Sequence, residues 1–137
     1  MKSIQSANGE ISRTTIQAKG DFRCDENEIV IAFYDTNTST NTQIRITNDT
    51  EVCISREGSL TSQMMIAVDK TIPFSYTTDA GTLQMETHGK SVRTNLNQNG
   101  GHLHLNYAIC MNGDILTINV IELDITLNVS RLPDVTA

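Results

Sequence analysis

The chain contains no tryptophan, and aromatic residues of all kinds make up only 4% of its 137 residues. Threonine and asparagine are abundant instead. Threonine favours β-strands and asparagine favours turns, so this bias fits β structure. Only two prolines occur, Pro73 and Pro133, and few strands are therefore expected to be interrupted. The length indicates one domain over residues 1–137.

Long apolar runs are also missing. No stretch approaches the roughly 20 apolar residues that a membrane-spanning helix needs. The N-terminal residues Met1–Gln5 show no apolar run of signal-peptide length. We therefore expect no membrane partner and a cytoplasmic location.

Positive charge is scarce. Lysine and arginine total 10 against 16 aspartates and glutamates, which gives a net charge of −6. No cluster of cations marks any predicted strand face. Because nucleic acids are bound through clustered cations, we expect no nucleic-acid partner.

Cysteine is limited to Cys24, Cys53 and Cys110. The number is odd, the spacing is wide, and no C-x-x-C pair occurs. This pattern favours three reduced thiols in the cytoplasm, with Cys24 buried.

The dominant pattern in the chain is an alternation with a period of two. It is clearest in the segment 101–110, where apolar and polar positions alternate. Successive side chains of a β-strand point to opposite faces, so this pattern predicts a strand with one buried face. One face carries Leu103, Leu105, Tyr107 and Ile109, and the other carries His102, His104, Asn106 and Ala108.

Similar alternation between short turns predicts an all-β protein with at most one short helix. Strands in hairpin order suit a single antiparallel up-and-down β-barrel of about eight to nine strands, which also avoids free strand edges. The expected strands are 2–7, 10–24, 28–34, 43–47, 50–56, 59–68, 71–77, 81–96, 101–110 and 114–129, some of them short or bent. The expected turns include Asn8-Gly9, Asn48-Asp49, Asp69-Lys70, Asn99-Gly100 and Asn112-Gly113.

The strand 81–96 contains a phase slip. Apolar positions are odd-numbered at Leu83 and Met85 but even-numbered at Val92 and Leu96. One extra residue near Gly89 would restore a common inner face, which predicts a β-bulge there. Bulges bend long strands, as closing a barrel requires.

The segment Asp35–Thr42 reads DTNTSTNT and is the one stretch of low complexity. We interpret it as a polar, solvated loop. A lid over the barrel mouth is the alternative interpretation.

His102 and His104 share one strand face, a spacing that some zinc sites use. A turn at Asn99-Gly100 would place Asn95 opposite His104 and leave His88 far along the strand, so no third ligand is near. We therefore expect surface histidines and no metal.

Catalytic constellations are missing as well. There is no G-x-S-x-G motif and no cysteine with a nearby histidine. Acidic residues such as Glu86, Glu122 and Asp124 fall on outer positions of the strands, as solvated residues do. We therefore expect no catalytic residues, no cofactor and no enzymatic activity.

Arg56 is the strongest candidate for a binding residue. It continues the alternation of Val52 and Ile54, which places it on the inner face. A buried guanidinium needs a partner, and no acidic residue is clearly inward on the neighbouring strands, so a ligand carboxylate or phosphate could pair with it. Tyr76 and Tyr107 lie at inner positions and could contribute hydroxyls. The alternative is that Arg56 ends its strand before Gly58 and reaches water at the rim.

The order Ser55-Arg56-Glu57-Gly58, then Tyr76 followed by Gly81, then Leu103-x-Leu105-x-Tyr107 resembles the YwiB-like family of small bacterial proteins of unknown function. The likeness runs from residue 10 to residue 126. It departs from the family at two positions, where Ala80 and Ile66 stand in place of aromatic residues. The resemblance implies a lipocalin-like (calycin-type) β-barrel in the bacterial cytosol and brings no activity or cofactor.

Two functions follow from these observations. The first is a barrel that binds a small apolar or anionic ligand in its interior, at Arg56, Tyr76 and Tyr107. The second is a structural or protein-interaction module with a filled interior. The oligomeric state stays open, with a homodimer as one alternative.

Overall fold

The computed structural model describes residues 2–7 and 10–127, and these residues form one antiparallel sheet of eleven strands. The described part contains no helix, and so no helix long and apolar enough to cross a membrane. The strands are β1 (Lys2–Ala7), β2 (Glu10–Thr15), β3 (Gly20–Cys24), β4 (Glu28–Asp35), β5 (Thr40–Thr47), β6 (Glu51–Gly58), β7 (Leu60–Ala67), β8 (Thr71–Thr78), β9 (Gly81–Asn97), β10 (Gly100–Met111) and β11 (Asp114–Thr126).

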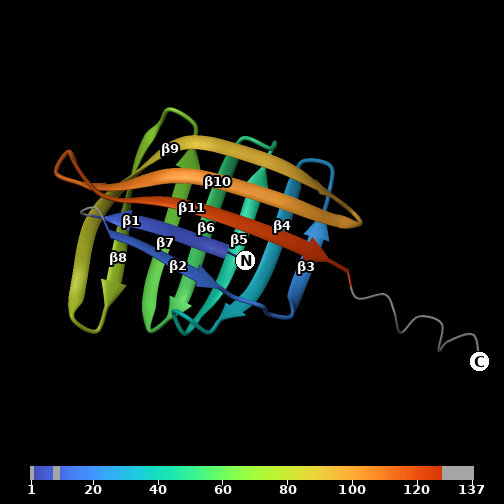
Figure 1. The fold of residues 1–137 in the computed structure, drawn as a ribbon, viewed down its shortest axis with the longest axis horizontal. Helices are drawn as coiled ribbons and strands as arrows, with labels where there is room; N and C mark the ends of the chain where they lie inside the picture. The colour runs from blue at the N-terminus through green and yellow to red at the C-terminus, as the bar shows by residue number, and fades with distance from the viewer. Residues whose placement is uncertain (1, 8–9, 128–137) are drawn as a thin grey trace, which may run out of the picture.

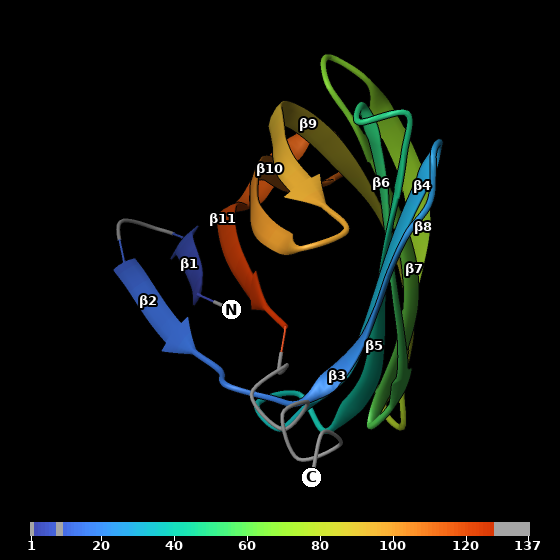
Figure 2. The ribbon, with the colours of Figure 1, turned by 90° about the vertical axis from the view of Figure 1, so that its right-hand side faces the viewer.

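Strands β3 to β11 follow one another as an up-and-down meander, and the β1–β2 hairpin adds to the far side of β11. The sheet coils on itself, so that β3–β8 face β9–β11 and β1 (Figures 1 and 2). Within the described residues β2 and β3 remain unpaired edges, which makes the fold a half-barrel. The prediction of an all-β antiparallel fold is confirmed, with eleven strands in place of eight to nine and with an open seam in place of full closure.

The single long strand predicted for residues 10–24 is wrong. It is divided into β2 and β3, which lie at opposite edges of the sheet. Residues 16–19 connect these two edges, and Ile16 is buried on the way, with 7% of its surface exposed. The alternation of apolar residues runs on through this connection because Ile16 faces the interior even though it lies outside any strand. Periodicity alone therefore gave no sign of the break.

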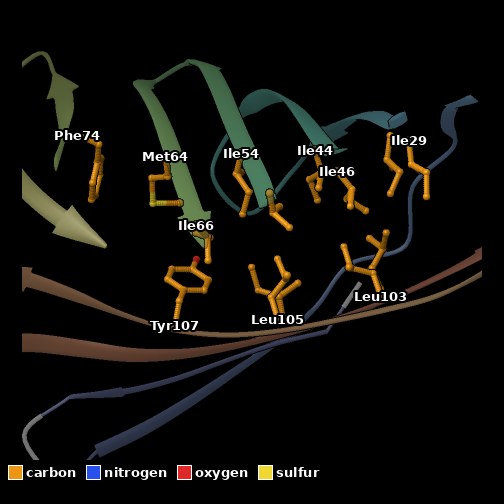
Figure 3. Close-up of a cluster of buried hydrophobic side chains, with 14 of the residues drawn as sticks. Ile29, Ile44, Ile46, Ile54, Met64, Ile66, Phe74, Leu103, Leu105 and Tyr107 are labelled. Atoms are coloured by element: carbon orange, nitrogen blue, oxygen red, sulfur yellow. The ribbon is translucent and has the colours of Figure 1, made fainter. Parts of the chain in front are cut away.

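The core lies between the two facing parts of the sheet (Figure 3). Leu103 and Leu105 of β10 point toward Ile44 and Ile54 of the opposite wall, and all four are almost fully buried. These are the inner positions that the alternation predicts. Burial of each such side chain contributes about 1.5–3 kcal/mol, so this aliphatic layer is the main source of stability.

Strand β9 joins the two walls because its first half pairs with β8 and its second half pairs with β10. The register with β10 shifts between Asn106 and Tyr107, where Ser91 and Gly89 are the partners and Lys90 is the extra residue. The predicted bulge near Gly89 is therefore confirmed. A Cβ atom at Gly89 would lie 2.2 Å from the carbonyl oxygen of Ala67. Glycine thus allows β9 to bend closely over the end of β7.

Several turns form at the predicted residues. Asn112 and Gly113 make a two-residue turn with φ values of 53° and 85°, as the primed hairpin turns require. Asn48 and Asp49 also have positive φ, at 52° and 59°. The predicted Asn8-Gly9 turn lies outside the described residues.

The turn between β9 and β10 differs from the prediction. Asn97 pairs with Gly100, so that the turn consists of residues 98–99. His102 therefore faces Asn95, and His104 faces Arg93. The register moved by two residues because the asparagine of an Asn-Gly pair here is the second turn residue. An even shift leaves every side chain on its predicted face.

The prediction of a solvated loop over Asp35–Thr42 is wrong at both ends. Only residues 36–39 form the turn, because β4 runs to Asp35 and β5 begins at Thr40. Asp35, Thr40 and Thr42 are buried, with 2%, 0% and 3% of their surface exposed. Burial is tolerated because the Asp35 carboxylate accepts hydrogen bonds from the turn and the threonine hydroxyls bond to one another.

Candidate functional site

Arg56 lies near the end of β6 on the inner face of the half-barrel. Its partner on β5 is Thr42 and its partner on β7 is Ser62. Val52 and Ile54 on the same strand are fully buried, which confirms the inner phase. Arg56 itself is half-buried.

The guanidinium of Arg56 lacks a full set of partners. Its Nε atom is buried and has no hydrogen-bond partner among the described residues. No acidic side chain of the described part forms an ion pair with it. Because an unpaired buried donor costs about 1–3 kcal/mol, this arrangement needs a reason.

A cavity of about 380 Å³ opens beside Arg56 between the two walls of the half-barrel. Tyr76 and Tyr107 line the same cavity, so the structure brings together the three residues that the sequence singled out. Tyr76 comes from β8, where it pairs with Ser62, and Tyr107 comes from β10. They reach the cavity from opposite walls, because β8 and β10 lie on different sides of the bend in β9 (Figure 2).

Tyr107 is almost fully buried, with 3% of its surface exposed. Its ring stands on β10 and points toward the wall that carries Met64 and Ile66 (Figure 3). Burial raises the pKa of its phenol above the ordinary value, and the positive charge of Arg56 partly offsets that rise. A phenol is protonated at neutral pH even at its ordinary pKa of about 10, so Tyr107 can donate a hydrogen bond into the cavity that Arg56 also lines.

Uncharged polar groups complete the cavity wall. Asn119 on β11 pairs with Tyr107, is 1% exposed and lines the cavity. Its amide nitrogen donates to the Thr117 hydroxyl at 2.9 Å. Ser62, 6% exposed, has a buried hydroxyl with no partner among the described residues. The sequence reasoning missed Ser62 and Asn119, although each occupies an inner position of its strand.

A row of three hydrogen-bonded threonine hydroxyls runs from the β4–β5 turn to Thr42, the β5 residue that pairs with Arg56. The hydroxyls of Thr38 and Thr40 are 2.7 Å apart, and those of Thr40 and Thr42 are 3.0 Å apart. The Ser59 hydroxyl donates to the carbonyl of Thr38, which ties this turn to the β6–β7 connection. The end of the cavity that Asn37 and Thr38 line, hereafter the mouth, is therefore held by a connected set of polar groups.

The prediction that no acidic residue near Arg56 clearly faces the interior is wrong for Asp35. Asp35 lines the same cavity as Arg56. The signal was present in the sequence, because Ile29, Ile31 and Phe33 share its parity. The predicted strand 28–34 ends one residue too early to include Asp35, because β4 runs to Asp35.

The two histidines of β10 lie on the outer face, away from this cavity. His102 pairs with Asp124 at 2.6 Å between Nδ1 and Oδ1, and His104 pairs with Glu122 at 3.4 Å between Nδ1 and Oε1. Each imidazole thus has its own carboxylate on the neighbouring β11. Within residues 2–7 and 10–127 no group of three or more candidate ligands could hold a metal ion.

The open seam of the half-barrel holds a second cavity of about 410 Å³. Phe22 and Phe33 line one side of it, and Leu123 and Ile125 line the other. Its lining differs from that of the first cavity, because no arginine or tyrosine lines it. The unpaired edge of β3 borders it.

The fold and the first cavity define a small all-β half-barrel whose apolar interior ends in a polar mouth. The sequence model of a family described as a domain of unknown function (DUF1934) matches residues 1–124, and the chain belongs to this family. The crystal structure of the YwiB protein from Bacillus subtilis is similar, with a TM-score of 0.74 and 17% sequence identity over 91% of this chain and 88% of that chain. These findings confirm the predicted likeness to the YwiB-like family. No curated protein matches the chain.

Proposed function

We propose that the half-barrel binds a small anionic ligand in the cavity beside Arg56, in the manner of a lipocalin-like cup. The observation that carries this proposal is the Nε atom of Arg56, which is buried without a partner in the wall of a 380 Å³ cavity. Cavities of about this size accept small organic molecules. A ligand carboxylate or phosphate would supply the missing charge-assisted hydrogen bonds.

The surrounding groups favour an anion over a neutral ligand. Tyr107 is a protonated phenol at neutral pH, and burial raises its pKa further, so it can donate to an acceptor. The unpartnered hydroxyl of Ser62 on β7 and the amide of Asn119 on β11 add further donors from the two facing walls of the cavity. The apolar side chains of Met64 and Phe74, which also line the cavity, would contact the rest of the ligand.

We propose binding without a chemical step and without a cofactor, in the bacterial cytoplasm. The three cysteines are all free, which supports a reducing compartment. The net charge of −6 argues against a nucleic-acid partner.

A thermal-shift screen tests the proposal. Fatty acids, nucleotides and small carboxylates are added to the wild-type protein, and the same compounds are added to Arg56→Leu. We expect at least one anion to raise the melting temperature of the wild type and to lose its effect in the variant, because ligand binding stabilises the folded state by mass action. A shift that is equal in both proteins would contradict a site at Arg56.

A protein-interaction module is the second candidate function. The specific observation in its favour is the unpaired edge of β3 beside the seam cavity, which Phe22 and Phe33 help to line. Exposed strand edges can pair with another chain. Light scattering would distinguish the two candidates, because self-association through β3 predicts a dimer that Phe22→Asp, a charge in the seam, returns to a monomer.

A further inference from the structure

Asp35 gives the cavity a second charged group, of opposite sign to Arg56. It ends β4 at the mouth, is 2% exposed and lines the same cavity. The two residues form no ion pair in the described part of the chain. The register explains this separation. Asp35 on β4 pairs with Thr40 of β5, whereas Arg56 on β6 pairs with Thr42 of β5. Asp35 therefore lies two strands away from Arg56 and one inward-facing position nearer the mouth.

Only half of the hydrogen-bonding capacity of the Asp35 carboxylate is used. Its Oδ1 atom accepts from the backbone N–H of Asn37 at 2.8 Å and of Thr38 at 3.2 Å. The other oxygen, Oδ2, has no hydrogen-bond partner among the described residues. Because Asp35 lines the cavity, a donor group on a bound ligand could reach this oxygen.

A simple alkyl anion would satisfy Arg56 and leave Asp35 facing the ligand without a donor. The like charges of a ligand anion and Asp35 would also repel each other. An anion that also carries hydroxyl or ammonium groups would supply the donor that Asp35 lacks, because those groups can donate to Oδ2. The cavity therefore presents donors at one position, at Arg56 and Tyr107, and an acceptor at another, at Asp35.

We propose that Asp35 determines specificity at this site, and that the ligand is a hydroxylated or amino-substituted anion, such as a polyol phosphate or a hydroxy acid. This inference rests on the proposed function, since Arg56 would hold the acidic group of the same ligand. Fatty acids and other plain alkyl anions would bind more weakly, because they leave the Asp35 carboxylate without a donor. The Asp35 turn itself needs only the Oδ1 acceptor.

Because Oδ1 serves the turn and Oδ2 is left for a ligand, the two roles can be separated by one substitution. Asp35→Asn keeps an oxygen that can accept from the N–H groups of Asn37 and Thr38, so the turn is preserved. It replaces the free carboxylate oxygen by an N–H₂ donor. Denaturant unfolding of the variant checks that the fold is retained.

Two matched pairs of probes are titrated calorimetrically, glycerol 3-phosphate against propyl phosphate and 3-hydroxybutyrate against butyrate. We expect the wild type to bind the hydroxylated member of at least one pair about tenfold more tightly, as a hydrogen bond to a charged group permits. Asp35→Asn should reduce that ratio to near one. Arg56→Leu should weaken both members of the pair together.

The outcomes separate this inference from the function on which it rests. Equal binding of both members by the wild type, weakened by Arg56→Leu, would overturn the role of Asp35 and keep the anion site. A preference that persists in Asp35→Asn would do the same. Binding of neither pair would overturn the hydroxylated-anion inference, and the thermal-shift screen would then decide about an anion site of another kind. The wild-type comparison needs no variant, so it decides even if Asp35→Asn fails to fold.

Discussion

Arg56 on β6 and Tyr107 on β10 interact electrostatically across the interior of the half-barrel, although they come from opposite walls of the sheet. The guanidinium lowers the pKa of the phenol while burial raises it, and burial is the larger effect. This relationship places a permanent cation beside a protonated phenol in one cavity. It has a measurable consequence at high pH.

Stability should fall at alkaline pH because of Tyr107. In the unfolded chain a tyrosine ionises near pH 10, whereas in the folded protein the raised pKa keeps Tyr107 protonated to higher pH. Above about pH 10 the unfolded state therefore binds fewer protons than the folded state, and the free energy of unfolding decreases as pH rises. Below that pH this contribution is fully present.

Urea unfolding at several pH values between about 9 and 11 measures this effect. Tyr107→Phe should show a shallower loss of stability than the wild type, by up to about 1.4 kcal/mol per pH unit. Tyr34→Phe is the matched control, because Tyr34 is 49% exposed on the outer face. Identical pH slopes for Tyr107→Phe and the wild type would refute the raised pKa.

Gly89→Ala should destabilise the fold by about 1–3 kcal/mol, as overpacking typically does. The added Cβ atom would lie 2.2 Å from the Ala67 carbonyl oxygen and 2.6 Å from its carbon, and both are backbone atoms that cannot move aside easily. Lys90→Ala, at the exposed neighbouring residue, is the control. Thermal or urea unfolding decides, and equal stability of the two variants would mean that β9 bends here without needing a glycine.

Thr40→Val should cost about 1–2 kcal/mol of stability, although the two side chains are nearly the same size. The Thr40 hydroxyl is fully buried and bridges those of Thr38 and Thr42, so its loss leaves two hydroxyls short of a partner. Thr77→Val removes an exposed hydroxyl that contacts Thr82 at 3.1 Å, and little change is expected there. If the two substitutions had the same small effect in denaturant unfolding, the row of hydrogen-bonded threonine hydroxyls would have no structural importance.

Much of the fold could be predicted because one face of each strand is buried. The alternation Val52, Ile54, Arg56 placed the arginine on the inner face, and the phase slip in β9 located the bulge at Gly89. Both signals depend only on neighbours along one strand. The same locality explains why the Asn112-Gly113 turn was predicted correctly.

What failed depends on contacts between distant strands. Ile16 lies outside any strand yet is buried, because the connection between β2 and β3 spans the seam between the two edges of the sheet. The alternation of its residues therefore resembles that of a continuous strand. Asp35 and Thr40 looked like loop residues because they are polar. Their burial is possible only through hydrogen bonds to a turn and to other threonines, which composition does not reveal.

The claim that Arg56 forms an anion site is decided by titrating the anion that gives the largest thermal shift into the wild type, Arg56→Leu and Arg93→Leu. Arg93 is exposed on the outer face of β9 and controls for the loss of one positive charge. We expect Arg56→Leu to weaken binding more than tenfold, since a charged hydrogen bond contributes about 1.5–3 kcal/mol. Its stability in urea should be unchanged or higher, because an apolar side chain replaces an unpaired buried donor. Unchanged affinity in Arg56→Leu, or a stability loss of a few kcal/mol in a protein that binds no anion, would contradict the claim and make Arg56 a structural residue.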